Sequence, residues 1–256
     1  MGEVDRIDDL VVLGRAAPEP IDDGRHTVCL GGYSETVGYV RLYPTQKWMD
    51  ELQRWNVVSV PVEDAHPDTR DESYKIAGSK AEWDTLHTKI EQVDQLTKTE
   101  QIQLVDELAT DCANALRDEE RSLGIVKPAA IHDFELDPRP DPTYQMTLDR
   151  ERQVGKTQYP YRLYIEYTCE GCQAKGHHRQ HCIEWGVYMY WDNNEDDEGV
   201  VDALRLTDDR YSHYFFIGNM QHQPTSYIII SDLRFSESDM LNAGVNSDRQ
   251  PALDQW

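Results

Sequence analysis

A cluster of cysteines and histidines between residues 169 and 182 constrains this chain more than any other feature. It contains Cys169, Cys172, His177 and Cys182, with the spacing C-x2-C-x4-H-x4-C. Zinc takes about four thiolate or imidazole ligands in a tetrahedron, and a two-residue gap lets one tight turn aim two sulfurs at the same point. Glycines inside that turn and just before His177 allow a close reversal of the chain. The spacing therefore predicts one zinc ion held in a zinc knuckle.

The fourth ligand and the role of this zinc have alternatives. His181 and His178 are candidates for the position given to Cys182. A redox Cys-x-x-Cys pair would not need the histidines that follow it. A catalytic zinc would need an open coordination position and a nearby general base. Glu184 is the one close carboxylate after the cluster, and the sequence has no H-E-x-x-H motif. A structural zinc is the preferred interpretation.

The charge balance of the chain indicates the medium in which it works. There are 48 acidic residues against 25 basic ones, a formal net charge of -23, and only 8 of the bases are lysine. An excess of acids with few lysines is typical of a salt-rich cytoplasm, where carboxylates hold water and salt screens their repulsion. The sequence has no apolar run of about 20 residues that would cross a membrane. Its first 25 residues also lack the pattern of a secretory signal. We expect a halophilic, cytoplasmic protein.

Hydrophobic periodicity predicts an α+β protein in which short strands flank a pair of helices. Apolar residues at helical spacing run from Trp83 to Leu116, and residues 97–100 have the form of a helix capping box. Cys112 falls on this apolar stripe and is expected to be a small core side chain. No internal repeat is visible. The predicted parts are a weakly ordered acidic lead (1–25), a β-barrel-like part (26–78), a helical pair (79–122), a β-rich part braced by zinc (123–235) and a frayed tail (236–256).

Three segments are poor in acids and stand out in so acidic a chain. Residues 156–182 hold four bases and two acids, and residues 73–80 and 210–231 hold no acid. Such segments are typical of a nucleic-acid-binding face, where bases meet phosphates and aromatic rings stack on nucleobases. Buried strands, which also lack charge, are the alternative. The predicted nucleic-acid-binding residues are Arg162, Lys175, Arg179, Arg41, Tyr43 and Lys75.

No Ser-His-Asp set, P-loop or dinucleotide fingerprint is present. Three kinds of function are compatible with the chain. The first is a module that binds nucleic acid, single-stranded by preference, since zinc knuckles often bind single strands. The second is a hydrolase or nuclease whose site forms only in three dimensions. The third is a subunit that binds another protein.

Several strings, taken in their order along the chain, resemble a prokaryotic family of haloarchaeal type that is associated with mobile or defence-type gene neighbourhoods. They cover most of residues 26–235. The resemblance implies small β-barrels of the OB type and a nucleic-acid-linked role in antiviral defence, and it names no activity. The strings are residues 28–32, 38–44, 72–76 and 122–128, the cysteine cluster with residues 183–185, and residues 215–219.

Overall fold

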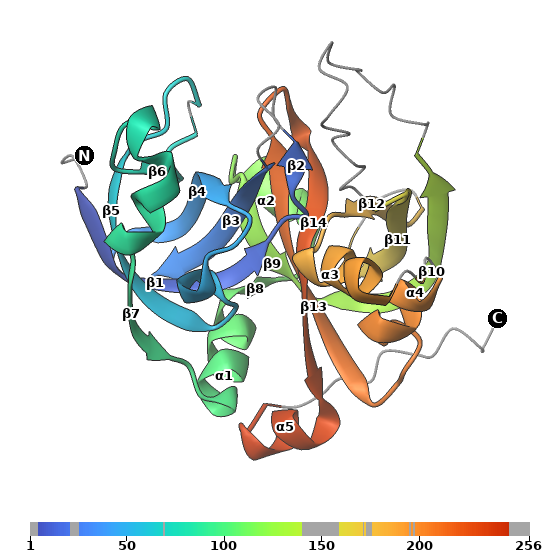
Figure 1. The fold of residues 1–256 in the computed structure, drawn as a ribbon. Helices are drawn as coiled ribbons and strands as arrows, with labels where there is room; N and C mark the ends of the chain where they lie inside the picture. The colour runs from blue at the N-terminus through green and yellow to red at the C-terminus, as the bar shows by residue number, and fades with distance from the viewer. Residues whose placement is uncertain are drawn as a thin grey trace, which may run out of the picture.

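The computed structural model describes residues 5–20, 26–68, 70–139, 159–170, 172, 176–194, 196 and 198–245. These residues form two seven-stranded sheets that lie side by side, with helices at their junction and at one end (Figure 1). The predicted α+β class is confirmed, with a closed barrel in the N-terminal part and a β-rich C-terminal part. Among the described residues, no helix has the length and apolar character needed to cross a membrane.

The first sheet closes into a five-stranded barrel because one strand pairs on both sides. Its elements are β1 (Arg6–Arg15), β2 (Glu19–Pro20), β3 (His26–Ser34), β4 (Gly38–Gln46), η1 (Asp50–Leu52), β5 (Asn56–Asp64), β6 (Ser73–Ile76), η2 (Lys80–Lys89) and β7 (Glu91–Gln95). The barrel runs β1-β3-β4-β6-β5, and β1 pairs with β5 through its first half and with β3 through its second half. Strands β4 and β6 are parallel.

The second sheet repeats this connectivity. Its elements are α1 (Lys98–Leu108), β8 (Ala109–Thr110), α2 (Ala113–Asp118), β9 (Leu123–Val126), β10 (Pro128–Pro138), β11 (Tyr161–Cys169), β12 (His178–Cys182), α3 (Trp185–Asn194), α4 (Gly199–Leu204), β13 (Tyr211–Met220), β14 (Gln223–Ser236) and α5 (Glu237–Asn242). Only Lys127 separates β9 from β10, so the two form one bent strand, which pairs with β13 through β9 and with β11 through β10. The sheet runs β10-β11-β12-β14-β13-β9, with β8 paired to β9 at the end, and the order returns to its start because β9 and β10 form one bent strand.

The two halves of the chain thus share one topology. When the bent strand is counted as strand 1, both barrels have the order 1-2-3-5-4, with strands 3 and 5 parallel. Each barrel also has helical structure between strands 3 and 4, which is η1 in the first half and α3 with α4 in the second. The two halves therefore repeat the same strand connectivity, but no repeat is visible in the sequence.

Strand β1 corrects the prediction that residues 1–25 are a weakly ordered lead. Leu10 and Val12 belong to the core of the first barrel, whereas Val11 and Leu13 belong to the cluster between the two barrels. A strand buried on both faces reads as a continuous apolar run without alternation. The acidic residues just before this run led to the prediction of a solvent-exposed, weakly ordered segment.

The two barrels pack through an apolar cluster that both contribute to. Phe216 of β13 is fully buried and stacks on Tyr39, with ring centroids 6.2 Å apart. Its ring occupies the space that a side chain at Gly31 would need, so glycine permits this close approach. Helices α1 and α5 pack together and add to the same cluster (Figure 1).

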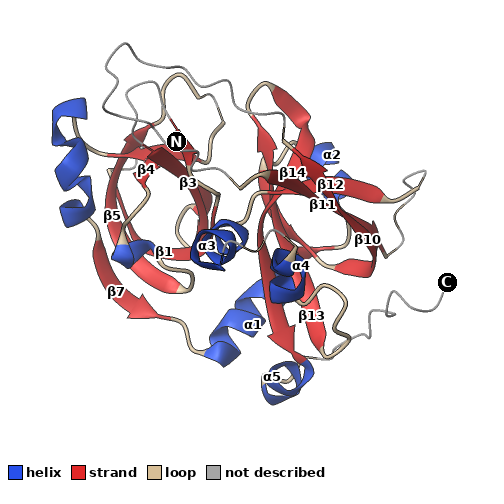
Figure 2. Ribbon diagram, turned by 45° about the vertical axis from the view of Figure 1, so that its right-hand side comes forward, coloured by secondary structure: helices blue, strands red, loops and turns tan. Residues whose placement is uncertain are grey.

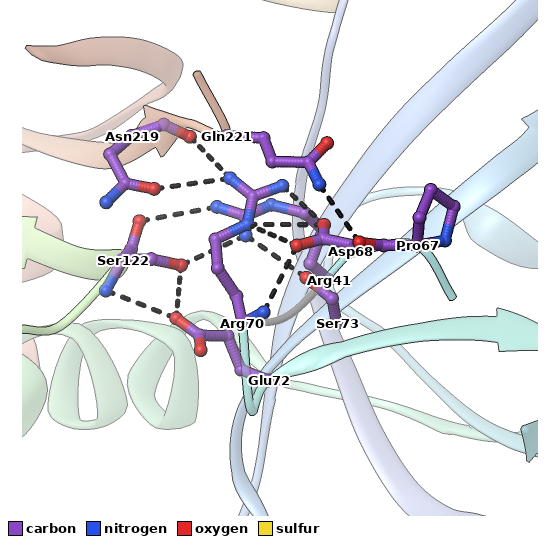
Figure 3. A network of polar contacts seen from close by, with 9 residues as sticks. All are labelled: Arg41, Pro67, Asp68, Arg70, Glu72, Ser73, Ser122, Asn219 and Gln221. Carbon is purple, nitrogen blue, oxygen red and sulfur yellow. Dashed lines mark hydrogen bonds and ion pairs between the residues drawn. The ribbon is translucent and has the colours of Figure 1, made fainter. Parts of the chain in front are cut away.

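A polar network fixes one end of this interface (Figure 3). Arg41 of the first barrel donates to the hydroxyl and carbonyl oxygens of Ser122, at 3.0 and 3.3 Å. Arg70 donates to the carbonyl oxygen of Asn219 at 2.8 Å and also pairs with Asp68. These bonds connect the side of the first barrel formed by β4 and β6 to β9 and β13 of the second. They hold the two barrels in one arrangement.

The predicted helical pair is present in altered form. Residues 80–89 form a 3-10 helix, and the exposed strand β7 separates it from α1. Helix α1 begins after Thr97, whose side chain accepts from the Glu100 backbone, so the predicted capping box is present. In the segment predicted to be a frayed tail, residues 237–242 form α5, and residues 246–256 lie outside the described part of the chain.

Candidate metal centre and predicted nucleic-acid residues

Three cysteine thiols and one imidazole converge where α2 meets the ends of β11 and β12. The ligand atoms of Cys112, Cys169 and His178 all lie within 4.8 Å of one another. The sulfur of Cys172 lies 3.0 Å from that of Cys112 and 3.3 Å from Nε2 of His178. Donors that share a zinc ion at about 2.0–2.3 Å stand roughly 3.3–3.8 Å apart. The cluster therefore has the composition and the size of a metal site.

Helix α2 directs backbone N–H groups at these sulfurs. Cys112 is the N-cap of the helix, and its Sγ accepts from the Asn114 backbone at 3.3 Å. The Ala113 backbone donates to Cys169, and the Asn114 side-chain amide lies 3.6 Å from the sulfur of Cys172. Hydrogen bonds of this kind orient metal ligands and stabilise thiolate charge. Three of the four donors thus already have the surroundings of metal-bound thiolates.

The protonation states of the thiols and of the imidazole are also compatible with a bound cation. Burial raises the pKa of Cys112 and of Cys169 above the ordinary thiol value, and the neighbouring thiols add to this effect. Burial, with Arg117 nearby, lowers the pKa of His178 and keeps its imidazole neutral. Buried thiols this close together could not ionise without a positive charge among them, and a bound metal would supply that charge as it displaces the protons.

The predicted ligand set needs two corrections. His177 has 45% of its side chain exposed, stacks on His132 and points Nδ1 toward Glu166 at 3.7 Å. Cys182 is buried opposite Leu163, at the far end of β12 from the cluster. Neighbouring residues of a strand point to opposite faces, so His178, one of the alternatives, faces the thiols while His177 faces away.

Cys112 takes the place that the sequence assigned to Cys182. It was expected to lie on the apolar stripe of a helix, but the helix ends at Leu108 and Cys112 starts a new one. No local spacing connects it to the other ligands, because it precedes Cys169 by an entire strand pair. Two of the five cysteines, Cys29 and Cys112, lie outside the predicted ligand set, and nothing in the sequence distinguishes one of them as a ligand. His181 faces outward beside Tyr164 on the opposite side of β12.

The predicted phosphate-binding arginines lie together on the outer face of β11 and β12, but acids neutralise them. Arg179 pairs with Glu135 at 2.5 Å and with Glu166 at 3.7 Å, and its guanidinium stacks on Tyr164 at 3.7 Å. Arg162 lies 3.8 Å from Asp137. This face is therefore a mixture of both signs rather than a positive patch.

The other residues predicted to bind nucleic acid differ in exposure and in their partners. Arg41 is 4% exposed and bonded to Ser122, so it cannot reach a phosphate, and that prediction is corrected. Lys75 is partly exposed and lies 3.5 Å from Glu63. Tyr43 is 43% exposed on the outside of β4, as a stacking residue must be. Lys175 lies outside the described residues.

Comparisons with known proteins leave the function open. A protein-family profile described as "Domain of unknown function (DUF8758)" matches residues 6–108, which span the first barrel and α1. No curated protein matches the chain. One solved structure, titled "Molecular basis for abrogation of activation of pro-inflammatory cytokines", is similar over 90% of this chain and 92% of that chain, with 7% sequence identity and a TM-score of 0.32. Similarity at that level establishes neither fold nor function.

Proposed function

We propose that this protein binds single-stranded nucleic acid through two OB-type barrels, the second of which is braced by one zinc ion. The observation that carries the proposal is the strand order. A closed barrel with the order 1-2-3-5-4, parallel strands 3 and 5, and a helical segment between strands 3 and 4 has the OB arrangement. OB barrels bind oligonucleotides on the face of strands 2 and 3, which here are β3 with β4 and β11 with β12.

The exposed side chains on these faces support the proposal. Tyr43 on β4 is exposed on the outer surface, and Tyr164 on β11 is a partly buried ring of the same kind of face, which the Arg179 guanidinium covers. Stacking on aromatic rings depends little on salt, whereas phosphate contacts weaken steeply as salt rises. A binder with a net charge of -23 would need stacking more than charge.

The zinc is proposed to be structural. Cys112, Cys169, Cys172 and His178 supply four donors, which complete a tetrahedral shell and leave no position for a reacting water. They come from α2, the end of β11, the segment after it and the start of β12. The ion would therefore join the segment between the barrels to the second barrel. A complete shell argues against a zinc hydrolase as the second candidate function.

The chain offers matched variants to test the ligand set. We expect about one zinc per chain in protein purified without chelator, with His178→Gln and Cys112→Ser losing it. His177→Gln and Cys182→Ala should keep it, because these residues lie outside the cluster. Elemental analysis gives the zinc content, and the absorption of the cobalt-substituted protein reports how many thiolates bind. Zinc retained by both ligand variants would disprove this set. Chelation of the zinc should unfold the second barrel first.

Nucleic-acid binding is tested by fluorescence anisotropy on the zinc-loaded protein. We expect a labelled oligothymidine and its RNA equivalent to bind more tightly than a duplex of the same length. Affinity should fall by roughly 0.7 log units per contacted phosphate for each tenfold rise in salt. If no single strand binds at the lowest salt at which the protein stays folded, the proposal fails and a protein-binding role becomes the better explanation.

A further inference from the structure

Two cations near the junction of the barrels, Arg15 and Lys47, contact aromatic rings instead of carboxylates. Arg15 at the end of β1 and Lys47 just after β4 form no ion pair within the described residues, whereas Arg162, Arg179 and Arg210 all pair with carboxylates. Arg15 and Lys47 lie over aromatic rings instead. In a chain with 48 acidic residues, both cations are thus in direct contact with rings, and Asp50, whose charge acts on Arg15, forms no ion pair with it.

The rings beside these cations form a continuous series from one barrel to the other. Trp48 meets Trp185 edge to face, with centroids 5.9 Å apart, and Trp185 meets Tyr188 at 5.8 Å. Tyr188 meets Trp191 at 6.0 Å, and Trp191 meets Tyr159, just before β11, at 6.0 Å. Trp185, Tyr188 and Trp191 are three residues apart, so they share one face of α3, which lies at the junction of the barrels (Figure 2).

The cations hold this series in place and leave positive charge beside it. The Arg15 guanidinium lies 4.3 Å from the Trp185 ring centroid and donates to the carbonyl oxygens of Gln46 and Lys47, at 3.0 and 2.8 Å. The Lys47 ammonium lies 4.9 Å from the ring centroids of both Trp48 and Tyr188 and donates to the Tyr188 hydroxyl at 2.7 Å. Arg15 is buried, so it positions the loop, whereas Lys47 is partly exposed beside the rings.

Three of the rings keep part of their surface exposed, although Arg15 covers one face of Trp185 and Trp191 packs against the core of the second barrel. Trp48 is 62% exposed, and Trp185 and Trp191 are half-buried, whereas Tyr188 and Tyr159 are buried beneath them. Trp185 and Trp191 are six residues apart on one helix, which is roughly 9 Å along its axis. Stacked bases of a duplex step by only about 3.4 Å. The spacing therefore suits bases that are unstacked from one another and rest on separate rings.

From this geometry we infer that Trp48, Trp185 and Trp191 form a stacking track for the bases of an unpaired strand, with Lys47 contacting a phosphate at the first-barrel end. The inference rests on the proposed function and gives it a location. It places the strand at α3, next to the ends of β4 and β12, which belong to the two barrel faces named above. Binding at such a track would persist in salt, because the track depends on rings more than on charge.

The test compares Trp48→Ala with the zinc-loaded wild type, using labelled oligothymidine and its duplex in fluorescence anisotropy. Removing one stacking ring should weaken single-strand binding roughly 5- to 150-fold. Trp48→Phe should keep most of the affinity, since it retains a ring. Leu241→Ala removes an even more exposed apolar side chain, on α5, and should bind like the wild type. Lys47→Gln should flatten the salt dependence by about 0.7 in the log–log slope.

The outcomes separate this inference from the proposed function. If the wild type binds single strands and Trp48→Ala binds them equally well, the track is wrong and the proposed function stands. If the wild type binds duplex as tightly as a single strand, with the same loss in Trp48→Ala, the track does not select unpaired bases. No binding by the wild type would overturn both. Since Trp48 is largely exposed, its replacement should leave the melting temperature unchanged, which confirms that any loss of affinity is local.

Discussion

The buried pair of His213 and Asp232 shows how single residues of an acidic chain are held charged in its interior. His213 Nδ1 lies 2.9 Å from an Asp232 oxygen, and the two side chains are 2% and 0% exposed. Burial alone would lower the pKa of His213, but the Asp232 charge and hydrogen bond raise it above the ordinary value. Burial would likewise raise the pKa of Asp232, and the charges of His213 and Arg234 lower it. The pair is therefore ionised in the folded state.

This ionisation makes stability depend on pH in a defined direction. Because its folded pKa is raised, His213 contributes fully below its unfolded pKa of about 6.5, and the contribution is lost as pH rises through the folded value. The difference in unfolding free energy between wild type and His213→Asn should therefore shrink as pH rises from about 6 to 9. Urea denaturation of both proteins at fixed salt and zinc measures it. A difference that grows with pH would contradict an ionised pair.

Among the elements, α1 is the one whose start the sequence specified best. Thr97 and Glu100 bond reciprocally, with the Thr97 backbone donating to the Glu100 carboxylate at 2.8 Å. The helix then buries Ile102 and Val105 between the barrels. A local motif of four residues is enough to set a helix start because all of its bonds form within one turn.

Loss of this cap should have a measurable cost. Thr97→Ala removes the hydroxyl that accepts from the Glu100 backbone, and we expect a loss of about 1 kcal/mol in unfolding free energy. Thr97→Ser keeps the hydroxyl and should lose only a few tenths of that amount. Chemical denaturation at constant salt compares the three proteins. Equal losses in both variants would show that the threonine acts through its methyl group rather than as a cap.

The same contrast between local and distant contacts explains what the sequence could not predict. Cys169 and Cys172 are three residues apart in the sequence, so their spacing alone brings them together, whereas Cys112 joins them only through tertiary packing. The choice between His177 and His178 depends on which face of β12 looks inward, and that follows from its pairing with β11. β1 was missed because its two apolar faces have different partners, one in each barrel. The sequence predicted short strands on either side of the helical segment, but it did not predict their order.

At the scale of the whole molecule, two closed barrels are joined by polar contacts on either side of an apolar interface. Arg41 and Arg70 hold one side (Figure 3). On another side Arg54 bonds to Glu184 at 2.6 Å and to the Asp232 carbonyl oxygen at 2.8 Å. These contacts are buried on at least one partner or partly buried on both, so salt screens them less than it screens the surface acids. Salt should therefore act on the surface and leave the joint between the barrels intact.

The net charge of -23 predicts that stability rises with salt. The screening length shrinks from roughly 10 Å at 0.1 M to roughly 3 Å at 1 M, and repulsion among surface carboxylates falls with it. We expect the melting temperature of the zinc-loaded protein to increase over this range of potassium chloride. Circular dichroism follows the unfolding. A melting temperature that stays level or drops would show that repulsion among the acids is not what limits the folded state.

The interface between the barrels also bears on how the chain emerges from a ribosome. Strand β6, which ends at Ile76, completes the first barrel, so that barrel can close early. Its outward apolar face, which includes Val11 and Leu13, stays uncovered until Tyr214 and Phe216 of β13 have been synthesised and can pack against it. At about 5–20 residues per second, those rings arrive roughly 7 to 28 s later. Helix α1 emerges first and shields part of that face, so a nascent chain stalled before residue 98 should aggregate more readily than one that has released α1.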